Sequence, residues 1–187
     1  MHGKKRGQKR GTSSRLGQSK GQIWIETVIY TLIALILIGA VLAFILPKIQ
    51  EIEDKATIEQ SIEMLQNIDS IISSVVLGGP GNKRIIDIGL KKGDLTINSE
   101  EDKIIFKMES QYTYSQEGEN ISIGGIIVLT EKIGSSNKIT LTGNYSKYDL
   151  TYEGENESRT ITHSTVPYKL SIENKGGSKT VVDLSFS

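Results

Sequence analysis

Residues 27–46 read TVIYTLIALILIGAVLAFIL, twenty consecutive positions without a charged side chain. At about 1.5 Å per residue, a helix of this length spans roughly 30 Å, which is the thickness of a bilayer's hydrocarbon core. A buried helix of a small soluble domain seldom offers such a run. The apolar part of an ordinary secretory signal is shorter, about 7–15 residues. The stretch therefore predicts a membrane-inserted helix that stays attached to the mature protein.

The charges on the two sides of this stretch differ. Seven basic residues and no acidic residue precede position 22. The whole chain has 22 basic and 22 acidic residues, so fifteen basic residues face 22 acids after that point, a charge of about −7. Because cytoplasmic flanks are rich in Lys and Arg, the N-terminus is expected in the cytoplasm and the body outside. The basic run predicts a targeting leader over residues 1–21, rather than a disordered tail or a nucleic-acid-binding arm.

Catalytic and metal-binding motifs are scarce in this sequence. It contains no cysteine and two histidines, His2 and His163, so thiolate sites and disulfides are excluded and a histidine-based centre has few ligands. The acidic run at 100–102 lacks the spacing of a calcium loop. No phosphate-binding glycine loop or nucleophile elbow is found. We expect no enzyme, no cofactor and no metal site, although a secreted enzyme whose site assembles only on folding stays open.

Residues 48–77 predict a second helical segment of different character. Pro47 lacks an amide hydrogen and clashes with the preceding turn, so we expect a kink or local break there. Apolar residues then recur at steps of three and four, whereas acids and lysines largely occupy the other face. The expected apolar stripe consists of Ile49, Ile52, Ala56, Ile62, Leu65, Ile68, Ile72 and Val75. The expected polar face consists of Glu51, Glu53, Asp54, Lys55, Glu59 and Glu63. The glycine-rich run at 78–81 ends the helix.

The remaining residues, 82–187, alternate with a period of two. We expect strands over 83–90, 95–98, 103–108, 121–131, 138–144, 148–152, 167–173 and 180–186, with surface loops at 111–120 and 152–165. Short β-branched strands at this spacing predict an antiparallel β-sandwich or small barrel. The fold class is therefore α+β, a long kinked N-terminal helix over 22–77 followed by a β-domain.

The segment KGQIWIE, residues 20–26, places a carboxylate at the entrance of the apolar helix. A lone carboxylate within the hydrocarbon costs about 2.5–3.5 kcal/mol, whereas in the headgroup zone it costs little. A short basic leader ending in Lys20-Gly21, then Gln22 and then Glu26 resembles the prepilin-type, or class III, signal of archaeal type IV pilins. Gln22 and Glu26 match the Gln-x-Ser-x-Glu pattern of that family, and Trp24 stands at its Ser position. The archaellins, the subunits of the archaeal swimming filament, have the same type of leader.

The resemblance implies a structural subunit rather than an enzyme. A prepilin peptidase would cleave after Gly21, processing the Lys20-Gly21-Gln22 segment and creating an amine on Gln22. In the filament, that amine would neutralise Glu26 of a neighbouring copy and so fix the register. The implied partners are identical copies, a pilus assembly ATPase, a membrane platform protein and, before assembly, lipid. The implied locations are the cell membrane for the precursor and the cell surface for the filament.

Three N-x-S/T triplets, at Asn120, Asn144 and Asn156, are candidate glycosylation sites on an exported body. Adhesion is one purpose such a filament would serve. Two alternatives to a pilin stay open at this point. One is an archaellin-type subunit, and the other is a monomeric, signal-anchored extracellular binding protein in which residues 1–26 only orient the anchor.

Overall fold

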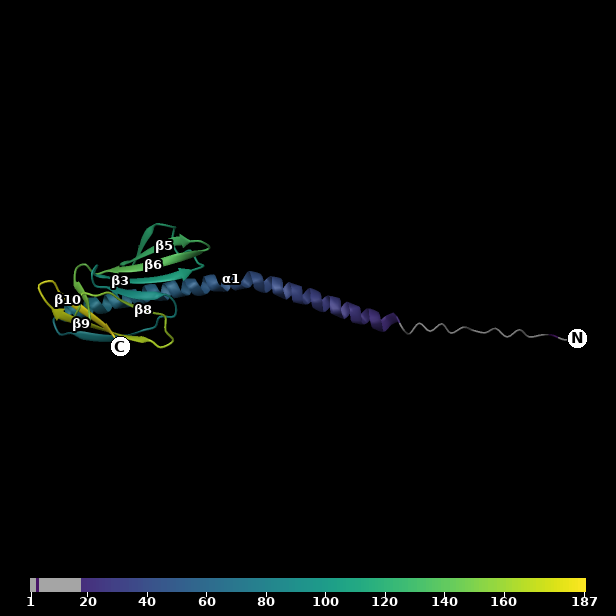
Figure 1. The fold of residues 1–187 in the computed structure, drawn as a ribbon, viewed down its shortest axis with the longest axis horizontal. Helices are drawn as coiled ribbons and strands as arrows, with labels where there is room; N and C mark the ends of the chain where they lie inside the picture. Colours follow the sequence, from purple (N-terminus) through teal and green to yellow (C-terminus); the bar gives the residue numbers. More distant parts are fainter. Residues whose placement is uncertain (1–2, 4–17) are drawn as a thin grey trace. The chain divides into compact units, whose positions relative to one another are not determined.

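The computed structural model describes Gly3 and residues 18–187 of the chain (Figure 1). Its first element is α1, a 60-residue helix over Gln18–Leu77 that begins ahead of the expected start at Gln22. Helical backbone continues through Pro47, so the expected local break is not found there, and the kink stays a prediction. The chain divides into two compact units, Met1–Leu46 and Pro47–Ser187, and the second contains the C-terminal part of α1 together with every strand.

Ten strands follow α1 and form two sheets. Their bounds are β1 Lys83–Ile88, β2 Asp94–Asn98, β3 Lys103–Ser110, β4 Asn120–Ile123, β5 Ile126–Ile133, β6 Ser136–Asn144, β7 Asp149–Tyr152, β8 Arg159–Thr162, β9 Tyr168–Gly176 and β10 Val181–Phe186. The four-stranded sheet has the order β1-β9-β10-β7, and the six-stranded sheet has the order β4-β5-β6-β3-β2-β8. Neither sheet closes into a barrel within residues 18–187. The α+β prediction is confirmed as one long apolar N-terminal helix followed by two sheets rich in antiparallel pairs.

The C-terminal part of α1 supplies one wall of the hydrophobic core. Figure 1 shows it alongside strands of both sheets, with β3, β5 and β6 on one side in this view and β9 and β10 on the other. Its buried apolar side chains are Ile58, Ile62, Leu65, Ile68, Ile72 and Val75, which join side chains of both sheets in one core cluster. In β3, for example, Ile104, Phe106 and Met108 alternate with exposed or half-buried neighbours, as a strand with one covered face requires.

The buried stripe of α1 differs at its start from the one expected. Ile49 and Ile52 are 45% and 68% exposed, and they do not belong to the core. Ile58 and the carboxylate of Asp54 are buried in their place. The reason is the helical period. At about 100° per residue, Asp54 and Ile58 lie on the same face as Leu65 and Ile72, whereas Ile49 and Ile52 lie on the opposite face.

The C-terminal end of α1 is held by a side chain from β9. The Asn174 amide, 2% exposed, donates hydrogen bonds to the carbonyl oxygens of Val75 and Val76, both at 3.4 Å. Its side-chain oxygen accepts a 2.8 Å bond from the Gly176 amide. The last carbonyls of a helix have no partner within the helix, so this contact satisfies two of them inside the core.

Two expected β segments are corrected by the structure. The strand expected over 121–131 is a hairpin, in which Gly124 and Gly125 connect β4 and β5 with Ile123 paired to Ile126. Both glycines have positive φ, 56° and 89°, as a two-residue hairpin turn of this kind requires. The loop expected over 152–165 contains β8, one of the two edge strands of the six-stranded sheet. The pairing of β7 with β10 is parallel, so the sheets are not wholly antiparallel.

Tyr145, just after β6, is 3% exposed, and its hydroxyl has no hydrogen-bond partner among the described residues. Its ring covers Gly143, where a Cβ atom would lie 3.0 Å from the Tyr145 ring. Burial raises the pKa of the Tyr145 phenol, and the nearby negative charge of Asp69 raises it further. The folded protein therefore keeps this phenol neutral at pH values where an unfolded tyrosine ionises.

Replacing Tyr145 by Phe should keep or increase the free energy of unfolding, by an amount on the order of 1 kcal/mol, because an unpaired buried hydroxyl is removed. The phenol pKa is higher in the folded state than in the unfolded state. Below about pH 10 the phenol is neutral in both states, and above that value the unfolded state ionises first, so the free energy of unfolding falls as the pH rises. The variant should lose less stability there than the parent. Denaturant unfolding at pH 8 and pH 11 measures both effects.

Tyr168→Phe is the matched control, because the Tyr168 hydroxyl donates a 3.0 Å bond to the Thr162 carbonyl. This control should lower stability at pH 8 by about 0.5–1.5 kcal/mol. An equal loss in both variants would contradict an unpaired hydroxyl at position 145.

Candidate functional site

The processing segment predicted from the sequence lies at the start of α1. Residues 1–2 and 4–17 of the expected leader lie outside the described residues. The backbone of Lys20, Gly21 and Gln22 is helical, in the first turns of α1. Gln22 and Glu26 are four residues apart, so they lie on the same side of the helix, one turn from each other. The expected cleavage point and the expected assembly carboxylate are thus neighbours on one helix.

The Glu26 side chain is exposed. Among residues 23–187, whose side chains the structure describes, none forms a hydrogen bond or an ion pair with its carboxylate. Exposed apolar side chains surround it along the chain, including Trp24 and Ile25 before it and Val28 after it. A carboxylate in an apolar environment needs a hydrogen-bond donor or a cation as its partner.

The part of α1 that follows Glu26, up to position 50, is not covered by any other part of the chain that the structure describes. Every residue from 23 to 50 is exposed, and the most apolar 18-residue window reaches a mean hydropathy of 2.9 with none of its residues buried. Two threonine hydroxyls of this part of the helix are satisfied locally, since Thr27 Oγ1 donates to the Ile23 carbonyl at 2.9 Å and Thr31 Oγ1 to the Thr27 carbonyl at 2.8 Å. These bonds lower the cost of placing threonine in an apolar environment. The described helix is long and apolar enough to cross a membrane.

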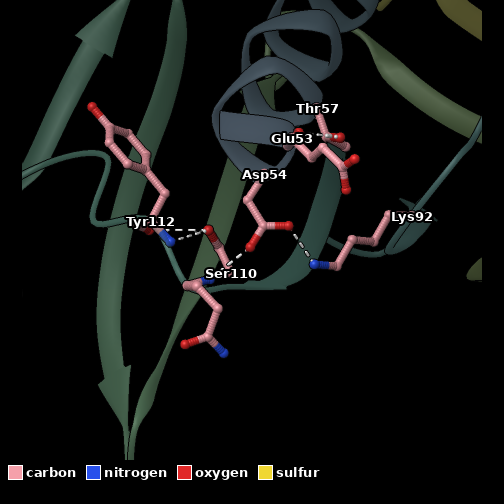
Figure 2. A network of polar contacts seen from close by, with 7 residues as sticks. Glu53, Asp54, Thr57, Lys92, Ser110 and Tyr112 are labelled. Atoms are coloured by element: carbon pink, nitrogen blue, oxygen red, sulfur yellow. Dashed lines mark hydrogen bonds and ion pairs between the residues drawn. The ribbon is translucent and has the colours of Figure 1, made fainter. Parts of the chain in front are cut away.

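A buried carboxylate fixes the helix at the point where it enters the body. Asp54 is 4% exposed. Its Oδ1 accepts a hydrogen bond from Lys92 Nζ at 2.5 Å, and its Oδ2 accepts one from the Gln111 backbone amide at 2.6 Å. Figure 2 shows Asp54 pointing from the helix towards the β-body, with Lys92 on one side and the segment after β3 on the other. We call Asp54, Lys92 and Gln111 the entry clamp.

The entry clamp joins elements that are distant in the sequence. Lys92 lies in the turn before β2, and Gln111 directly follows β3. The backbone after Gln111 is held in turn by Ser110, whose hydroxyl accepts a 2.9 Å bond from the Tyr112 amide and donates one to the Tyr112 carbonyl (Figure 2). With both carboxylate oxygens satisfied, the buried charge is paired on one side and hydrogen-bonded on the other. The clamp therefore sets the rotation of this segment of α1 about its axis, and its position along that axis, relative to the β-body.

The other predicted surface sites lie apart from one another on the β-body. Asn120 opens β4, Asn144 closes β6, and Asn156 lies in the loop between β7 and β8; all three side chains are exposed. The Asn144 side-chain oxygen accepts a 3.0 Å bond from the Ser146 amide, within its own triplet. Each asparagine is therefore accessible to a modifying enzyme in the folded body.

His163 lines an open surface pocket of about 450 Å³. The other side chains that line it include three lysines, Lys92, Lys107 and Lys138, and two carboxylates, Asp94 and Glu109. Charges of both signs alternate there, as on an ordinary solvated sheet face. Within residues 18–187, no group of three or more histidine, aspartate or glutamate side chains is arranged to hold a metal ion.

Two functional contacts were missed in the sequence, Asp54 in the entry clamp and Asn174 at the helix end. Asp54 carried a signal, because on a helical wheel it falls among the apolar positions and not among the acids. Asn174 carried none, since its role depends on a contact across 99 residues of sequence. The chain matches no protein-family model, no curated protein and no solved structure.

Lys92→Met should lower the free energy of unfolding by about 2–3 kcal/mol, because it leaves a buried negative charge with one remaining donor. Asp54→Asn should cost only about 1 kcal/mol, because it removes the charge and keeps an oxygen for the Gln111 amide. Lys103→Met is the control; Lys103 pairs with Glu101 at 2.7 Å on the surface, and its loss should cost no more than about 0.5–1 kcal/mol. Chemical denaturation of the detergent-solubilised chain measures all three. Equal losses at Lys92 and Lys103 would rule out a structural role for the clamp.

Proposed function

We propose that this chain is a structural subunit of an archaeal type IV pilus or a pilus-like surface filament. The precursor resides in the membrane with its N-terminus in the cytoplasm. A prepilin peptidase removes residues 1–21 after Gly21. An assembly ATPase and a membrane platform protein then drive the mature subunit into a filament, where identical N-terminal helices form the core and the β-bodies form the surface.

One observation carries this proposal, namely an apolar helix without cover that has a single carboxylate at its entrance. The exposed large apolar side chains of residues 23–46 expose far more hydrophobic surface than a soluble protein tolerates. Two coverings satisfy such a helix in succession, lipid for the monomer and equivalent helices in a filament. Lipid tails and neighbouring Leu or Ile side chains are similarly apolar, so the transfer costs little and helix packing can drive it.

The role we assign to Glu26 follows from its charge. After cleavage, the new α-amino group of Gln22 on one subunit lies within reach of the Glu26 carboxylate on its neighbour. An ion pair in an apolar core is a poor source of net stability but an effective device for fixing register, because every other register leaves a charge unpaired. If the N-terminal glutamine cyclises, the amine is lost, and a backbone N–H group takes its place as donor.

The body completes the proposal on the outside of the filament. We propose that its two sheets form a β-sandwich that faces the medium, with Asn120, Asn144 and Asn156 as accessible acceptors for glycans and adhesion as the purpose of the filament. An archaellin-type filament would use the same helix and the same carboxylate. A monomeric signal-anchored protein would keep the basic leader and would leave Glu26 without a role.

Substituting Glu26 by Ala or Gln should leave membrane insertion unchanged, since removal of a charge only favours it. Filament yield should fall by at least about tenfold, because the amine of the neighbouring subunit would be left in the apolar core without its carboxylate, and breaking a buried pair in this way costs about 3–5 kcal/mol. Glu53→Gln, at another exposed glutamate of α1, is the control and should assemble normally. The measurement is the amount of subunit in sheared surface filaments relative to the amount in membranes. Normal yield from Glu26→Ala would remove the proposed role of this carboxylate.

A further inference from the structure

A second apolar stripe runs along α1 on the face away from the body. It consists of Ile49, Ile52 and Ala56, which we call the outer stripe. Ile49 and Ile52 are 45% and 68% exposed, and Ala56 is half-buried. At about 100° per residue, these three side chains fall within roughly 60° of one another and on the opposite side of the helix from Asp54 and Leu65. The body therefore covers one face of this segment and leaves a narrow apolar face bare.

Charged residues border the outer stripe without entering it. Lys48, Glu51 and Lys55 form one ridge beside the stripe. Lys48 pairs with Glu51 at 2.8 Å, and Lys55 lies 3.8 Å from Glu59, at the point where the stripe ends. The stripe ends after Ala56, because the next positions on the same face are Glu59 and Glu63. An apolar face bounded in this way has the width of a helix–helix contact rather than that of a membrane-facing surface.

The spacing of the outer stripe is that of a helix-packing seam. Ile49, Ile52 and Ala56 follow steps of three and four residues, the a and d positions of a heptad repeat. In the sequence, the same steps continue backwards through Ile45, Leu42, Ile38 and Leu35, all within the uncharged span. Because every residue from Leu35 to Leu46 is apolar, this part of the span shows no preferred contact face. The outer stripe shows one, because the residues on either side of it are charged.

Lipid is a poor cover for this stripe. The twenty uncharged residues that end at Leu46 already fill about 30 Å of hydrocarbon. Ile52 lies about 9 Å further along the helix axis, next to Lys48, Glu51 and Glu53, which belong in water. The opposite face is covered by the protein's own body. What remains is a partner with a matching apolar face that extends past the membrane surface.

We propose that the outer stripe binds the apolar helix of a second copy of this chain, so that the subunit contact extends about ten residues beyond the membrane span. This inference rests on the proposed function and adds to it a defined contact face. Since the body lies on the other side of α1, contact through the outer stripe leaves the body outside the helical core. Ala56 then marks the end of the helix–helix contact, and Glu59 the beginning of the wet surface between bodies.

Site-specific photo-crosslinking in the full-length chain tests this face, without requiring that two particular residues meet. A benzophenone amino acid is placed at Ile52 or Ile49 in the outer stripe, at Glu51 or Lys55 in the charged ridge, or at Leu42 in the span. Cells are irradiated, and the adducts are separated by size and identified by mass spectrometry. We expect a chain–chain adduct from both stripe positions, at a yield near that of the Leu42 probe and about tenfold above that of the ridge positions, because reaction requires contact with the partner.

Adducts from Leu42 but not from the stripe, or equal adducts from stripe and ridge, would contradict the proposed contact through the outer stripe. Either result would still be compatible with the proposed filament. Lipid adducts alone at Ile49 and Ile52, with chain–chain adducts at Leu42, would contradict the contact in the same way. Lipid adducts alone at all three positions would overturn both the stripe and the filament, and would favour a monomeric anchor. Val166, which is 69% exposed in the loop between β8 and β9, controls for random collision and should give no specific adduct.

Discussion

The β-body cannot be separated from the helix that emerges from it. Six apolar side chains of α1 are buried among both sheets, and at about 1.5–3 kcal/mol for each fully buried side chain they contribute roughly 10 kcal/mol. A domain of this size has a net stability of about 5–15 kcal/mol, so removing the helix would remove an amount comparable to the whole. Residues 23–50 of the same helix are exposed, and in the proposed filament they are covered first by lipid and then by other copies of the chain. This difference between the two parts of one helix governs the rest of the structure.

Two polar contacts hold the part of α1 that packs against the sheets. The entry clamp at Asp54 fixes its beginning, and the Asn174 amide fixes its end at Val75 and Val76. About twenty residues of α1 lie between these two contacts, and their buried face is mainly apolar. Apolar packing alone tolerates sliding and rotation more readily than hydrogen bonds do, because the bonds have defined partners. The rotation of the helical segment after Pro47 relative to the sheets is therefore set, and this gives the outer stripe a fixed direction.

The sequence predicted what depends on local pattern. The uncharged run, the three- and four-residue steps of Ile62 to Val75, and most strands follow from periodicity and were recovered. The β4–β5 hairpin was missed although Gly124-Gly125 is a strong two-residue turn signal, because the apolar residues around it read as one continuous strand. Strand β8 has a single buried apolar residue, Ile161, which is too weak a pattern to separate from a loop.

The pairing of β7 with β10 and the role of Asn174 depend on contacts that only the folded chain brings together. The assembly role of Gln22 and Glu26 remains a prediction, since it concerns contacts between copies.

The intact mass of the native polypeptide, recovered from sheared surface material, tests the central claim most directly. A filament subunit has lost its cationic leader, so the mass after enzymatic or chemical removal of glycans should correspond to a chain that begins at Gln22, with or without the loss of ammonia that accompanies glutamine cyclisation. A mass that includes Met1 to Gly21, from material that sediments as single subunits, would contradict the account. The apolar helix would then be a permanent membrane anchor, and the carboxylate at its entrance would have no partner to find.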